Sequence, residues 1–148
     1  MIAGLPLHPL LVHSAVVLVP LVAIGALVMS YLPSFSRRNG KLILILALVA
    51  QVSVFLAKLS GQAFSEILNK EVEKHAELGE IAPFVTIPMV ALIYLRWRMD
   101  RAGSSIGNPA IRRLTSVALV ISSFASLVII FLVGHSGATS VWGWIDKL

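Results

Sequence analysis

Four long apolar runs limit what this chain can fold into. A helix needs about 20 apolar residues to cross the roughly 30 Å hydrocarbon core of a bilayer, and such segments occur at residues 9–32, 42–64, 75–97 and 114–135. Only 13% of the 148 residues are charged, against about 25% in soluble domains. We therefore predict an all-α membrane protein with a single domain over residues 1–148, folded as an antiparallel bundle of four transmembrane helices.

Composition and motifs exclude several classes of function. The chain has no cysteine, which excludes disulfides, thiolate-bound zinc, iron–sulfur clusters and covalently attached haem. The basic residues lie between apolar runs and not along one polar face, so we expect no nucleic-acid partner. Hydrolase, phosphate-binding and dinucleotide-binding motifs are also missing from the sequence. An electron carrier or accessory subunit is therefore favoured over an independent enzyme.

The connecting segments predict an orientation in the membrane. The two connections on one side hold eight basic residues and one acidic residue, within 33–41 and 96–113. The opposite side holds four lysines and six acidic residues. Basic connections remain in the cytoplasm, so we predict a bacterial inner-membrane protein with both termini on the outer, periplasmic side.

Three histidines lie at similar predicted depths on the outer side. His13 precedes Arg37 by 24 residues, His75 precedes Arg96 by 21, and His135 follows Arg113 by 22. At about 1.5 Å per helical residue, these depths agree within roughly 5 Å. A single histidine at this level is usually an interfacial residue, but three from different helices favour a shared cofactor or metal site. His8 ranks below them because it lies further out and about 140° around the helix from His13.

Other polar residues enter the same predicted layer. Lys58 and Gln62 lie near the outer end of the second span, where Lys58 either extends its ammonium group to the surface or meets an anionic cofactor group. Glu71 precedes His75 by four residues and either orients its ring or belongs to a solvated acidic face. We include Lys58 and Gln62 among the candidate cofactor-binding residues, with Glu71 as a supporting residue.

The opening Leu7-His8-Pro9-Leu10-Leu11-Val12-His13 resembles the start of a domain-of-unknown-function family of small four-helix bacterial membrane proteins. The similarity extends over nearly the whole chain, through Gly61 and His75 to an ending at Gly134-His135-Ser136-Gly137. This chain departs from the family pattern at Ser14-Ala15, where members often have Phe-Pro, and at Ser136 and Ala138, where some have Leu and Gly. The resemblance implies a membrane bundle with outward-facing histidines. Relatives joined to cytochrome-like modules suggest a redox setting.

Three functions remain open from the sequence. The first is electron transfer by a b-type haem held by two imidazoles, with His13 and His75 as first choice and His135 as substitute. The second is a non-catalytic accessory subunit of a larger respiratory or transport complex. The third is a Cu or Zn site made by His13, His75 and His135, with His8 as a weaker candidate ligand. Expected partners are the lipid bilayer, other membrane subunits or a second copy, and a quinone or periplasmic redox protein.

Overall fold

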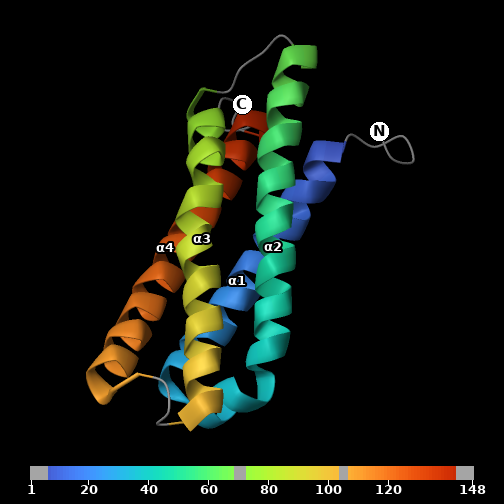
Figure 1. The fold of residues 1–148 in the computed structure, drawn as a ribbon. Coiled ribbons are helices and arrows are strands. Elements are labelled where there is room, and N and C mark those ends of the chain that lie inside the picture. The colour runs from blue at the N-terminus through green and yellow to red at the C-terminus, as the bar shows by residue number, and fades with distance from the viewer. Residues whose placement is uncertain (1–6, 69–72, 104–106, 143–148) are drawn as a thin grey trace.

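Four antiparallel helices form the bundle in the computed structural model, which describes residues 7–68, 73–103 and 107–142. Helix α1 covers Leu7–Tyr31, α2 Pro33–Leu68, α3 Glu73–Ala102 and α4 Pro109–Trp142. All four are long and apolar enough to cross a membrane. Consecutive helices run in opposite directions, so α1 begins and α4 ends at the same end of the bundle (Figure 1). The predicted fold class is confirmed.

The helices extend beyond the predicted spans, most clearly at the start of α2. Leu32 alone separates α1 from α2, and its N–H still donates to Val28 O at 2.9 Å. Proline disfavours helical geometry in the residue before it but is well tolerated at the first helical position, so Pro33 ends one helix and begins the next. Arg37 and Arg38, which we expected in a connecting loop, therefore lie in the first turns of α2.

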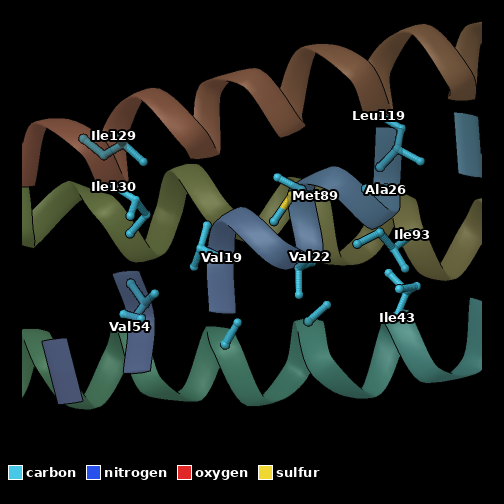
Figure 2. Packing of buried hydrophobic residues seen from close by; sticks show 14 of the residues in the cluster. Val19, Val22, Ala26, Ile43, Val54, Met89, Ile93, Leu119, Ile129 and Ile130 are labelled. Atoms are coloured by element: carbon cyan, nitrogen blue, oxygen red, sulfur yellow. The ribbon is translucent and has the colours of Figure 1, made fainter. Parts of the chain in front are cut away.

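Small and medium apolar side chains fill the centre of the bundle. On α1, Val19, Val22 and Ala26 are almost completely buried, and they recur at the spacing that places residues on one helix face. They pack against buried residues of the other helices, such as Ile93 and Leu119 (Figure 2). Many large apolar side chains, by contrast, point outward. That distribution suits a protein whose surrounding solvent is lipid.

A polar contact joins α2 to α3 near the middle of the bundle. Thr86 donates from Oγ1 to Gln51 Oε1 at 2.8 Å, and Gln51 donates from Nε2 to the carbonyl of Pro83 at 3.0 Å. Without water, an unpaired polar group costs several kcal/mol. These bonds therefore make Gln51 compatible with a position inside the membrane.

An ion-pair network joins α3 to α4 at the opposite end from the histidines. The Asp100 side chain is fully buried and accepts from Arg96 Nε at 2.8 Å and from an Arg112 guanidinium nitrogen at 2.6 Å. Arg112 also donates to the carbonyls of Met99 and Gly103 at 2.9 and 3.1 Å. These carbonyls belong to the last turn of α3 and the residue after it, so Arg112 fixes the start of α4 against the end of α3.

We expect Asp100→Asn to lower the free energy of unfolding by about 3–5 kcal/mol, because it leaves two guanidinium groups without their shared carboxylate. Reversible denaturation in mixed detergent micelles measures this change. Arg38→Gln is the control, since Arg38 is exposed and forms no ion pair with any described residue. Equal stability of the two variants would contradict a supporting role for the network.

Candidate functional site

Two histidines from different helices meet at the end of the bundle where α1 begins. His8 lies in the first turn of α1 and His75 in the first turn of α3. Their ring centroids are 6.3 Å apart and the ring planes are inclined by 78°. Both residues are half-buried. The structure thus brings together one predicted ligand, His75, and the histidine that ranked lowest in the sequence.

The His8 ring is held by helix α2. Its Nδ1 lies 3.1 Å from the carbonyl oxygen of Ala57 and 3.1 Å from Ser60 Oγ. The Ser60 hydroxyl donates to the same carbonyl at 3.0 Å, so its oxygen accepts from the ring. Because a carbonyl can only accept, Nδ1 carries the proton in this arrangement. In the neutral ring the lone pair then lies on Nε2.

The His75 ring is held by helix α4 in the same way. Its Nδ1 lies 3.1 Å from the carbonyl oxygen of Val133 and 3.1 Å from Ser136 Oγ. Ser136 donates to that carbonyl at 3.0 Å. The α1–α2 pair and the α3–α4 pair therefore orient their imidazoles with the same set of bonds.

A glycine follows each of these serines and leaves room for the ring. A Cβ added at Gly61 would lie 3.0 Å from His8 Cε1, and one added at Gly137 would lie 3.0 Å from His75 Cε1. Such contacts are shorter than normal carbon–carbon packing distances. We call Ser60-Gly61 and Ser136-Gly137 the two Ser-Gly steps. In each step, the serine oxygen accepts a hydrogen bond from the ring N–H, and glycine permits the ring to approach the helix.

The other two histidines lie outside this pair. His13 is exposed, and its Nδ1 bonds the Pro9 carbonyl within its own helix at 2.6 Å. His135 is exposed and stacks on Phe131 with centroids 5.9 Å apart. Among the described residues, no group of three or more His, Asp or Glu side chains is placed to hold a metal ion. The structure therefore does not form the expected cluster of His13, His75 and His135.

Helical geometry explains the difference from the expected cluster. Counting residues from the arginines estimates depth in the membrane but not direction around the helix. Neighbouring positions on a helix differ by about 100°, so His135 does not share the face of Ser136, which bonds His75. His13 likewise lies on a different side of α1 from His8.

The remaining candidate residues take up separate contacts. Lys58 places its ammonium nitrogen 5.2 Å from the centroid of the exposed Phe84 ring. Gln62 donates to Glu80 Oε1 at 3.4 Å. Glu71, the predicted supporting residue, lies outside the described residues. The groups that orient His8 and His75 are instead carbonyls and hydroxyls of α2 and α4.

One signal for this site is present in the sequence. A Ser-Gly dipeptide occurs late in the second and fourth helices, and each of the preceding helices has a histidine in its first turn. The structure gives Gly61 a specific function, because the close neighbour at Gly61 is the His8 ring.

The fold and this pair define a four-helix membrane protein with two oriented histidines at one end of its bundle. The chain belongs to the family described as predicted membrane protein (DUF2231), whose model matches residues 4–144. This confirms the resemblance seen in the sequence. No curated protein and no solved structure matched the chain.

Alanine substitutions at glycines test whether the rings occupy the Ser-Gly steps. Gly79→Ala should stabilise the fold by up to about 1 kcal/mol, because alanine favours helix and nothing lies within 4 Å of the added carbon. Gly137→Ala forces His75 to move, at a cost of about 1–3 kcal/mol that cancels this gain. Thermal unfolding in detergent compares the two variants. An equal gain in both would show that the ring does not rest on Gly137.

Proposed function

We propose that the protein binds one b-type haem through His8 and His75 and transfers single electrons near one face of the membrane. The observation that carries this proposal is the pair of imidazoles, each oriented by a carbonyl and a serine beside a glycine. This choice replaces His13 by His8 as the partner of His75.

The separation of the two rings supports a shared metal ion. Two rings that hold one metal ion must each place a nitrogen about 2 Å from it, so their centroids must lie close together. The ring centroids of His8 and His75 are 6.3 Å apart, which is near enough for both residues to hold one ion.

The hydrogen bonds support ligation through Nε2. Metal-binding histidines usually donate their other ring N–H to a carbonyl or carboxylate, which fixes the tautomer and direction of the ring. Here Ala57 and Val133 provide the carbonyls. Both imidazoles are thereby prepared as neutral ligands, the form that binds a metal.

The number of ligands favours haem over zinc. Zinc sites need three or four protein ligands, whereas the described residues contain no such group. A haem brings its own four nitrogens, so two histidines would suffice to hold it. When bound, it would supply reversible one-electron chemistry at the iron. His8 and His75 would hold the group, and the carbonyls and serines of α2 and α4 would orient these two residues.

The charge distribution supports an orientation for this centre. Eight basic residues lie at the end of the bundle opposite His8 and His75, six of them exposed. By the positive-inside rule, that end faces the cytoplasm of a bacterial inner membrane. The histidine pair and both termini then face the periplasm. A membrane quinone or a periplasmic redox protein would be the electron partner.

Histidine variants test the proposal directly. Protein purified in detergent from haem-producing cells should show a Soret band that shifts on dithionite reduction. His8→Ala and His75→Ala should each abolish the band, because each removes one of the two residues that would hold the haem. His13→Ala and His135→Ala are matched controls and should retain it.

Two results would overturn the haem proposal. One is the absence of a reducible Soret band in the unmodified protein, both as purified and after addition of haem. The other is a band that survives in both His8→Ala and His75→Ala. A cofactor-free protein that co-purifies with larger membrane subunits would instead support the accessory function.

Serine variants test the orientation of the rings. Ser60→Ala and Ser136→Ala should each weaken haem affinity by about 10- to 100-fold, the usual effect of removing a hydrogen-bond partner of a metal ligand. Haem titration of the cofactor-free protein measures the change. Ser140→Ala is the control, since Ser140 is exposed and bonds only within its own helix, to Gly137 O. A comparable loss in this control would argue against a specific effect of the two serines.

A further inference from the structure

An apolar groove lies far from the histidine pair, where the end of α1 meets the start of α4. Its volume is about 170 Å³, and it is lined by Ser30, Tyr31, Ser116, Val117, Val120 and Ile121. The α4 residues from 116 to 121 cover about 8 Å along the helix axis. Val117 and Ile121 are exposed on the surface that faces lipid.

The serine hydroxyls in this groove already have partners. Ser30 donates to the carbonyl of Ala26 at 3.0 Å, and Ser116 donates to the carbonyl of Arg112 at 3.0 Å. Arg96 also donates to Ser116 Oγ. The groove therefore offers mainly carbon surface to an occupant, which suits a hydrocarbon chain better than a polar molecule.

Arg113 lies directly beyond the groove on the same face of α4. Residues three, four, seven and eight positions apart share a helix face, and the four α4 lining residues follow Arg113 at these spacings. Arg113 is exposed and forms no ion pair with a described residue. A cation is thus placed at the end of an apolar groove.

The charge around Arg113 favours an anion. Five further exposed basic residues lie at this end of the bundle: Arg37, Arg38, Lys41, Arg98 and Arg101. Asp100 is the acidic residue described there, and it is buried between Arg96 and Arg112. The exposed charge of this end, as far as the structure describes it, is therefore entirely positive.

We propose that an anionic phospholipid binds here, with its phosphate beside Arg113 and one acyl chain in the groove between α1 and α4. The cation selects the anionic headgroup, while the groove requires a hydrocarbon chain and so disfavours a free phosphate. This site would fix one lipid to the protein at the end opposite the histidine pair, and it is independent of haem binding.

Lipid titration followed by native mass spectrometry tests the proposal. The detergent-solubilised protein should bind one phosphatidylglycerol more tightly than phosphatidylcholine. Arg113→Gln should weaken this binding by about five- to tenfold, the effect of one cation near an anionic headgroup. Arg98→Gln removes another exposed cation, from α3, and should change phosphatidylglycerol binding less than about twofold. Thermal unfolding shows whether both variants remain folded. If the protein binds haem, the haem absorbance of each variant provides the same check.

Two further measurements separate the headgroup from the acyl chain. Ile121→Trp fills the groove but keeps Arg113, and it should weaken phosphatidylglycerol binding. Glycerol 3-phosphate, which lacks acyl chains, should not compete. Equal losses in Arg113→Gln and Arg98→Gln, no preference for phosphatidylglycerol, or unchanged binding by Ile121→Trp would each overturn the proposed site.

Discussion

The absence of water from the bilayer is the constraint on which this structure depends. Every backbone N–H and C=O in the hydrocarbon region must find a partner within the protein, and four helices meet that demand. Polar side chains must do the same. Thr86 and Gln51 pair with each other and with backbone carbonyls, and Asp100 is enclosed by two arginines. Each such contact also fixes the position of one helix against another.

The histidine pair follows from the same constraint. His8 and His75 satisfy Nδ1 by bonding a carbonyl and a serine on the neighbouring helix. Because the diagonal helices α1 and α3 are in contact, two rings held in this way approach each other at the end of the bundle. The bonds that make an imidazole compatible with the membrane are therefore also the bonds that would orient it in the ligand role that we propose.

The two ends of the bundle have different chemical characters. One end brings together two hydrogen-bonded imidazoles, and the other combines an internal ion-pair network with exposed cations. Electrostatic attraction to anionic headgroups acts at the basic end, whereas the proposed cofactor would lie at the other. The two ends of the bundle would therefore meet different surroundings on the two sides of a membrane.

The sequence by itself determined the four helices, their alternating direction and the separation of basic from histidine-bearing ends, because these depend on the length of apolar runs and on local charge. It also included His75 among the candidate ligands. Only the tertiary structure decided that His8 is the residue facing His75 and that His13 and His135 lie outside the pair. The depth of a side chain in the membrane can be estimated by counting residues along the chain. Which residue that side chain faces depends on the position of the neighbouring helix, and for His8 and His75 on the serine and glycine of that helix.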